Sequence, residues 1–135
     1  MKRVCEENKK SGEKIFGVLA SFGEILKPEI IELFEPEGIL NVHPSDLPKY
    51  RGPSPIETAI LAGERKIGVC VMKIAEKMDA GVVYEKGFLE IEGLKKAEIY
   101  AKAGKMGADM VISVAKRVIQ GEKLEFTAQD EEKAT

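Results

Sequence analysis

Short apolar runs alternate with longer, mixed polar and apolar segments along this chain of 135 residues. The short runs have the length and β-branched content of buried strands, and the longer segments repeat their apolar residues at helical spacing. Proline and glycine residues separate the two kinds of segment. We predict strands at 15–23, 38–43, 66–74 and 81–91, the last broken near Gly87, and helices at 26–34, 53–63 and 95–121.

Two of the predicted helices carry informative residues. At 53–63, Ser54 can cap the helix and Glu57 can complete a capping box. The longest helix has a stripe of methionine and branched residues at helical spacing, which indicates a core face rather than a binding surface. Gly104 and Gly107 within it either weaken the helix or permit a close approach of another backbone.

The alternation of strands and helices predicts an α/β fold. Because the connections are short, we expect a mostly parallel sheet with helices on both faces and right-handed crossovers. The segment ASFGEILKP does not match GxGxxG, so a dinucleotide-binding turn is not indicated. We treat residues 1–135 as a single domain, with a polar lead-in at about 1–14 and a polar C-terminal segment at 122–135.

Composition and charge restrict the class of protein only loosely. Hydrophobic residues make up 44% of the chain and charged residues 33%, with a net charge of −2, which gives no broad case for nucleic acid or membrane binding. Cys5 and Cys70 belong to no CxxC motif, so the sequence argues against a zinc site or a disulfide framework. Cys70 lies in the apolar run IGVCVM and is expected to be a buried free thiol. With no signal peptide or membrane-spanning stretch in the sequence, we expect a cytoplasmic protein.

The only histidine of the chain lies at the end of the strand predicted at 38–43. Asn41 and His43 are two residues apart, so their side chains should point to the same side of the sheet. Both can donate hydrogen bonds, and two donors aimed at one point form a plausible oxyanion site. Pro44 and Pro48 stiffen the loop that follows. The alternative is a strand-end histidine that only binds this loop.

An aspartate follows the next predicted strand. Asp79, in EKMDAG, either forms a turn or faces His43 across neighbouring strand ends. A carboxylate in that place would favour the protonated imidazole and could hold a water for proton transfer. Arg51, in the loop after His43, is either an anion or RNA contact or a cap for its own loop. We favour the structural role because an isolated basic residue rarely marks a site.

These motifs occur together in GILNVHPSDLPKYRGPSPIETAILAGERKIGVCVMKIAEKMDAG, residues 38–81. This stretch resembles the folate-dependent formyltransferase family, and within it most closely the members that act on methionyl-tRNA. The family pattern is an N-x-H strand end, a Ser-Leu-Leu-Pro loop, a [Y/W]RG turn, and a D-x-G loop one strand later. Asp46 stands where the family usually has the first leucine. The resemblance covers about residues 15–135.

The resemblance implies transfer of a formyl group from 10-formyltetrahydrofolate to an amine, with methionyl-tRNA as the acceptor and without a metal. It implies that Asn41 and His43 stabilise an oxyanion intermediate, and that Asp79 keeps His43 protonated and assists proton transfer. The folate donor would lie against residues from three segments, namely Phe22, Gly23, Ile25, Leu26, Ser45, Asp46, Leu47, Pro48, Ala75 and Met78.

The first half of the family's catalytic domain has no counterpart in this sequence. We therefore expect a partial Rossmann-like formyltransferase domain, the C-terminal portion of the catalytic domain, whose sheet another chain could complete. Two alternatives stay open. The acceptor could be a nucleotide-sugar amine or glycinamide ribonucleotide, or the chain could be a non-catalytic folate-binding or assembly fragment.

Overall fold

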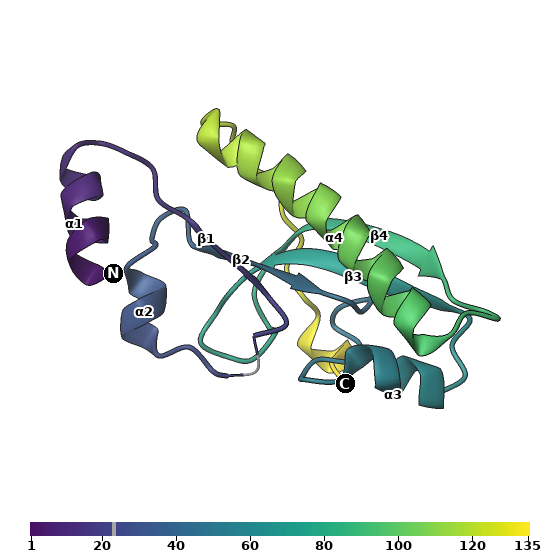
Figure 1. Ribbon diagram of the computed structural model, residues 1–135. Helices are drawn as coiled ribbons and strands as arrows, with labels where there is room; N and C mark the ends of the chain where they lie inside the picture. The colour runs from purple at the N-terminus through teal and green to yellow at the C-terminus, as the bar shows by residue number, and fades with distance from the viewer. Residues whose placement is uncertain (23) are drawn as a thin grey trace.

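The computed structural model describes residues 1–22 and 24–135, whose strands form one sheet in the order β1-β2-β3-β4 (Figure 1). The strands and helices expected from the sequence are present, with ends shifted by a few residues. None of the helices in these residues is long and apolar enough to cross a membrane. The elements are α1 (Lys2–Lys10), β1 (Gly17–Ala20), α2 (Pro28–Glu32), β2 (Ile39–His43), α3 (Pro55–Leu61), β3 (Lys66–Lys73), β4 (Val83–Glu90), α4 (Lys96–Ile119) and the 3₁₀ helix η1 (Glu131–Lys133).

The sheet is mixed, and the expectation of a mostly parallel sheet is wrong. Strands β1 and β2 are parallel, whereas β2 with β3 and β3 with β4 are antiparallel. The link between β3 and β4, residues 74–82, is shorter than the dozen or more residues that a parallel crossover needs. The link at 44–65 is longer and contains α3. It does not cross to the other end of the sheet, so β3 starts near the end of the sheet at which β2 finishes and runs antiparallel to it.

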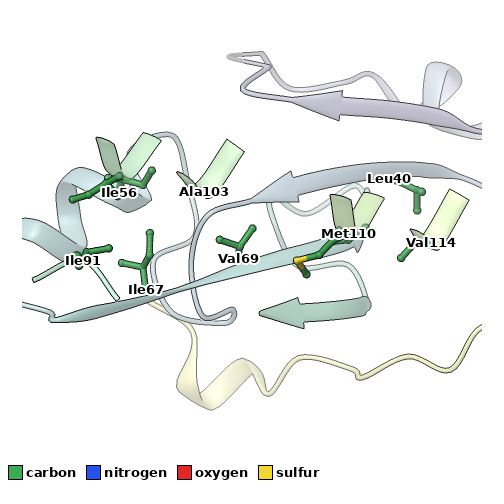
Figure 2. Packing of buried hydrophobic residues seen from close by; sticks show 11 residues of the cluster. Leu40, Ile56, Ile67, Val69, Ile91, Ala103, Met110 and Val114 are labelled. Atoms are coloured by element: carbon green, nitrogen blue, oxygen red, sulfur yellow. The ribbon is translucent and has the colours of Figure 1, made fainter. Parts of the chain in front are cut away.

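One face of the sheet carries the main hydrophobic core. Side chains alternate along β3, and Val69 and Val71 point toward the face that α3 and α4 cover. Figure 2 shows Val69 on β3 with Met110 of α4 nearby and Ile56 of α3 farther along the same layer. Each fully buried aliphatic side chain contributes about 1.5–3 kcal/mol to stability. The buried members are Leu40, Ile56, Ala59, Ile67, Val69, Val71, Ile91, Ile99, Ala103, Met110 and Val114.

We expected helices on both faces of the sheet, but the other face of β3 is covered by a loop. Leu47, from the loop after β2, is buried with Cys70, Met72 and Val83. Gly68 permits this approach, because a Cβ there would lie 2.6 Å from the backbone of the loop. Cys70 is a buried free thiol as the sequence predicted, and burial raises the pKa of its thiol.

Glycines determine how closely α4 lies on the sheet. A Cβ at Gly107 would overlap Cγ1 of Val42 on β2, whereas a Cβ at Gly104 would meet nothing within 4 Å. Of the two roles expected for these glycines, close approach therefore applies to Gly107. The predicted break in the last strand is wrong, because β4 continues through Gly87. That glycine instead leaves room for Met106, whose Sδ would be 3.1 Å from a Cβ.

Helix α3 begins as predicted after Ser54, but the expected capping box is not formed. The Ser54 side chain makes no capping hydrogen bond. Glu57 instead accepts hydrogen bonds from the Tyr100 hydroxyl at 2.8 Å and forms an ion pair with Lys96 at 2.7 Å. The bonds from Lys96 and Tyr100 lower the pKa of Glu57 to about 2, and the bond from Lys96 has the larger effect. Glu57 therefore ties α3 to α4.

Candidate active site

The histidine and the aspartate predicted from the sequence lie side by side. His43 ends β2, and Asp79 lies in the loop between β3 and β4. His43 Nδ1 is 3.7 Å from Asp79 Oδ2, and the two side chains are 6% and 13% exposed. The route to this proximity differs from the expected one. Because β3 is antiparallel to β2, its last residue pairs with Leu40, and the loop that follows returns toward His43.

The second ring nitrogen of His43 binds the loop after β2. Its Nε2 is 2.9 Å from the backbone carbonyl oxygen of Tyr50. A carbonyl can only accept, so Nε2 carries the proton and donates it. In a neutral ring Nδ1 is then an acceptor, and it can donate only when the ring is protonated. The strand-end alternative is thus also realised, since His43 both binds its loop and faces Asp79.

The backbone around Asp79 holds its carboxylate in place. Asp79 has φ +49°, in the left-handed region that few residues other than glycine adopt. Its Oδ2 accepts a hydrogen bond of 2.7 Å from the amide of Gly52, which has φ +101°. Asp79 is therefore a turn residue whose side chain connects the two loops beside His43.

Asn41 lies two residues before His43 on β2, so the two side chains are on the same face of the sheet. It pairs with Met72 on β3, and His43 pairs with Cys70, so both side chains lie on the face away from α4. Asn41 is half-buried. An amide group and an imidazole are thus presented together on one side of one strand.

The loop from Ser45 to Pro48 turns two of its side chains, Ser45 and Leu47, toward the protein interior. Ser45 is buried, and its hydroxyl donates to the Lys49 carbonyl at 2.6 Å. Leu47 lies in the core, with 3% of its surface exposed. Asp46 forms an ion pair of 2.7 Å with Lys86 on β4, and Lys86 also donates to the Leu47 carbonyl. The charge of Asp46 is therefore paired with a lysine on the sheet.

A cleft of about 480 Å³ lies beside the Asp79 loop. Pro28 and Ile31 of α2 line one part of it, and the segments 73–76 and 80–82 line another. Its volume is within the range of small-molecule sites. Ala75, one of the residues expected to contact the folate donor, is part of this lining.

Other residues expected to contact the donor are exposed. Phe22 and Met78 are half exposed, and Ile25 is 72% exposed. Leu26 and Pro48 are half-buried. Gly23 lies outside the described residues. Exposed apolar side chains of this kind are available to a ligand, and their assignment to donor binding stays a prediction.

The sequence did not reveal the role of the C-terminal strap, residues 127–135. Thr127 pairs with Val83 at the edge of β4, and the strap, yellow in Figure 1, continues past the sheet toward α3. Arg51, which is 10% exposed, binds Glu131 at 2.7 Å, and Lys77 binds the same carboxylate. Arg51, followed by Lys77, lowers the pKa of Glu131 to about 2. The structural role favoured for Arg51 is present, with the strap as its partner.

A family model described as Formyl transferase matches residues 5–119. The chain belongs to the formyl transferase family. The match includes β2, the loop after it, β3 and the Asp79 loop. The resemblance drawn from the N-x-H, YRG and D-x-G motifs is therefore confirmed. The strap lies beyond the matched residues.

Individual members of the formyl transferase family agree with this assignment. A methionyl-tRNA formyltransferase of Chloroflexus aggregans is 38% identical over 120 residues, which are 88% of this chain and 38% of that protein. The solved methionyl-tRNA formyltransferase of Clostridium thermocellum superposes with a TM-score of 0.72 at 22% identity, covering 97% of this chain and 53% of the other. WlaRD, a sugar 3N-formyl transferase solved in the presence of dTDP and 5-N-formyl-THF, gives a TM-score of 0.75 at 25% identity, covering 91% and 43%.

These comparisons confirm the predicted fold class, a Rossmann-like formyltransferase domain, with the strand directions corrected above. The chain spans 38% of the length of the curated relative from Chloroflexus aggregans. The family assignment therefore covers the fold and the motif region that this chain contains.

Proposed function

We propose that this chain carries the catalytic site for transfer of a formyl group from 10-formyltetrahydrofolate to the amino group of methionyl-tRNA. The supporting observation is the contact between His43 and Asp79, beside Asn41 on the same strand, in a member of the formyl transferase family. The curated relatives named methionyl-tRNA formyltransferase support the choice of acceptor.

In this proposal Asn41 and His43 stabilise the charge that develops on the formyl oxygen. When an amine adds to the formyl carbon, that oxygen becomes negative. The Asn41 amide and a protonated His43 can both donate to it. Because Nε2 of His43 already donates to the Tyr50 carbonyl, the donor toward the substrate is Nδ1–H.

Asp79 would act on protons. Its carboxylate lies 3.7 Å from Nδ1 and can pair with the ring when Nδ1 carries a proton. The attacking amine must lose a proton, and the folate nitrogen that leaves must gain one. The Asp79 side chain keeps 13% of its surface exposed and can hold a water that carries this proton.

The folate donor would occupy the cleft beside the Asp79 loop. Its volume suits a ring system, and Ala75 and the neighbouring backbone can provide contacts. The exposed apolar side chains of Phe22, Ile25 and Met78 would close around the ligand. Ser45 and Leu47 would contribute through their backbone, because their side chains point inward.

A transfer assay with matched variants tests the proposal. We expect His43→Ala and Asp79→Asn to reduce formyl transfer to methionyl-tRNA by about 10²–10³-fold, the effect of losing one oxyanion donor or its support. Asp109→Asn is the control, since Asp109 is an exposed acid on α4 that pairs only with Lys105 among the described residues. Equal rates for wild type and His43→Ala would refute the mechanism.

The alternatives are separated by the acceptor and by binding. The same assay with glycinamide ribonucleotide and with a nucleotide-sugar amine determines which amine is formylated. Calorimetric titration with 10-formyltetrahydrofolate distinguishes an enzyme from a fragment that binds folate without transfer.

We also propose that residues 1–135 are the C-terminal portion of a formyltransferase catalytic domain whose sheet another chain extends. Strand β1 is at one edge of the described sheet, pairing only with β2 there, and Val18 on it is half exposed. Native mass spectrometry tests for the second chain, and a fully active monomer would exclude it.

A further inference from the structure

The C-terminal strap contacts both loops that hold the candidate catalytic pair. We infer that the strap is the element that positions His43 against Asp79, with Gln129 and Thr135 as its positioning residues. The kinetic part of this inference rests on the proposed function, whereas the structural part can be tested without any activity.

Gln129 joins the two loops through a single side chain. Its amide nitrogen donates to the carbonyls of Asp79 and Gly81, at 2.7 and 2.8 Å. Its amide oxygen accepts two bonds from Arg51, from Nε at 3.1 Å and from an NH2 group at 2.9 Å. Arg51 directly precedes Gly52, whose amide holds the Asp79 carboxylate. Gln129 therefore holds Asp79 in two ways. It binds the backbone carbonyl of Asp79 directly, and through Arg51 it holds the loop whose Gly52 amide binds the Asp79 carboxylate.

Thr135 holds the loop on the histidine side. Its hydroxyl accepts a hydrogen bond of 2.8 Å from the amide of Tyr50, and its backbone oxygen accepts one of 3.0 Å from the backbone amide of Arg51. Its own amide donates to the Pro48 carbonyl at 3.2 Å. The carbonyl of Tyr50 is the acceptor for His43 Nε2. Thr135 thus fixes the peptide that selects the protonated nitrogen of His43.

The strap acts at the two strained points of these loops. Tyr50 and Asp79 both have positive φ, at +55° and +49°, and the strap binds each of them directly. Non-glycine residues keep such a conformation only where the surroundings enforce it. The hydrogen bonds of Gln129 and Thr135 provide that enforcement.

The strap is held by polar contacts rather than by burial. Most of its residues are exposed, and neither hydrophobic cluster contains any of them. A change in one of its side chains should therefore alter the loops without unfolding the core. This separates positioning from general stability.

The single histidine of the chain allows a direct test by NMR of the ¹⁵N-labelled imidazole. We expect wild type to show a proton on Nε2 that exchanges slowly with solvent. Thr135→Ala removes one side-chain hydrogen bond and Gln129→Ala removes four. In both variants the exchange should be about fivefold faster or more, the effect of losing at least one hydrogen bond, and the Nδ1–H tautomer should increase. Thr135→Ser keeps the hydroxyl and should restore the wild-type spectrum.

Glu132→Ala is the matched control, because this strap residue uses only its backbone amide in the hydrogen bonds of the described chain. Circular dichroism on every variant checks that the core remains folded. Identical His43 spectra in wild type and both alanine variants would overturn the inference.

Kinetics extend the test. If the proposed function holds, Gln129→Ala should lower kcat by about 10–100-fold and change the KM for the folate donor by less than about twofold, because geometry rather than binding is lost. A changed spectrum with no transfer even in wild type would refute the proposed function and leave the positioning role standing. Identical His43 spectra in wild type and in both alanine variants, together with formyl transfer by wild type, would refute the positioning role and leave the proposed function standing.

Discussion

Two glycines one turn apart on α4 have opposite surroundings. A methyl group added at Gly107 would overlap Cγ1 of Val42, whereas one added at Gly104 would enter open space. Alanine in place of either glycine favours the helix by about 0.8–1.0 kcal/mol. Only at Gly107 must a neighbour, the partly buried Val42, also move, and such overpacking typically costs about 1–3 kcal/mol.

We therefore expect Gly104→Ala to raise the free energy of unfolding by about 0.5–1 kcal/mol. Gly107→Ala should lower it by up to about 2 kcal/mol, which is the overpacking cost less the helix gain. The gain is common to both variants, so their difference isolates the clash. Val42 cannot easily relieve it, because a β-branched side chain is stiff and β2 is paired on both sides.

Urea denaturation followed by circular dichroism measures both free energies of unfolding. The double variant Val42→Ala/Gly107→Ala completes a mutant cycle, and we expect it to be more stable than additivity predicts by about 1 kcal/mol or more. Equal stabilities of the two glycine variants would refute the reasoning, and so would a strictly additive cycle.

Two ion pairs give further expectations. The folded pKa of Glu57 is depressed to about 2, so its contribution is present above the ordinary carboxyl pKa and is lost as pH falls from about 4.5 through about 2. Because Glu57 and Lys96 are partly exposed, Glu57→Gln should cost only about 0.5–1 kcal/mol at pH 7, and acid titration of the unfolding midpoint should show the difference vanish near pH 2. Asp46→Asn removes the half-exposed pair with Lys86 and should change the free energy of unfolding by less than about 1 kcal/mol; a larger loss in thermal denaturation would mean that the pair fixes the loop.

The apolar pattern located the strands and the long helix because it reflects burial. It predicted β3 and α4 well, since a continuous apolar run and a helical stripe each point to a covered face. Burial carries no information on strand direction, so the parallel arrangement was an assumption from the connections. The short link at 74–82 was the signal in the sequence that should have indicated an antiparallel pair.

The candidate site was predictable where its side chains form a motif. Asn41 and His43 form an N-x-H motif at a predicted strand end, and Asp79 begins a D-x-G motif after the next strand. The carbonyl of Tyr50 has no such signal, because any residue provides the same backbone group. Gln129 was also missed, since a polar residue far along the chain gives no local indication of which loop it binds. The burial of Ser45 and Leu47 could not be predicted, because single letters do not tell which way a loop side chain points.

Cys70 on β3 is the cross-strand partner of His43 on β2, so the two side chains lie on the same face of the sheet. Its Sγ is fully covered and donates to the Ser45 carbonyl at 3.1 Å, beneath the loop that follows β2. An alkylating reagent can reach this sulfur only after the loop has lifted from β3. The rate of thiol modification at Cys70 therefore measures how often the loop after β2 separates from β3, which is a local unfolding event beside the candidate active site.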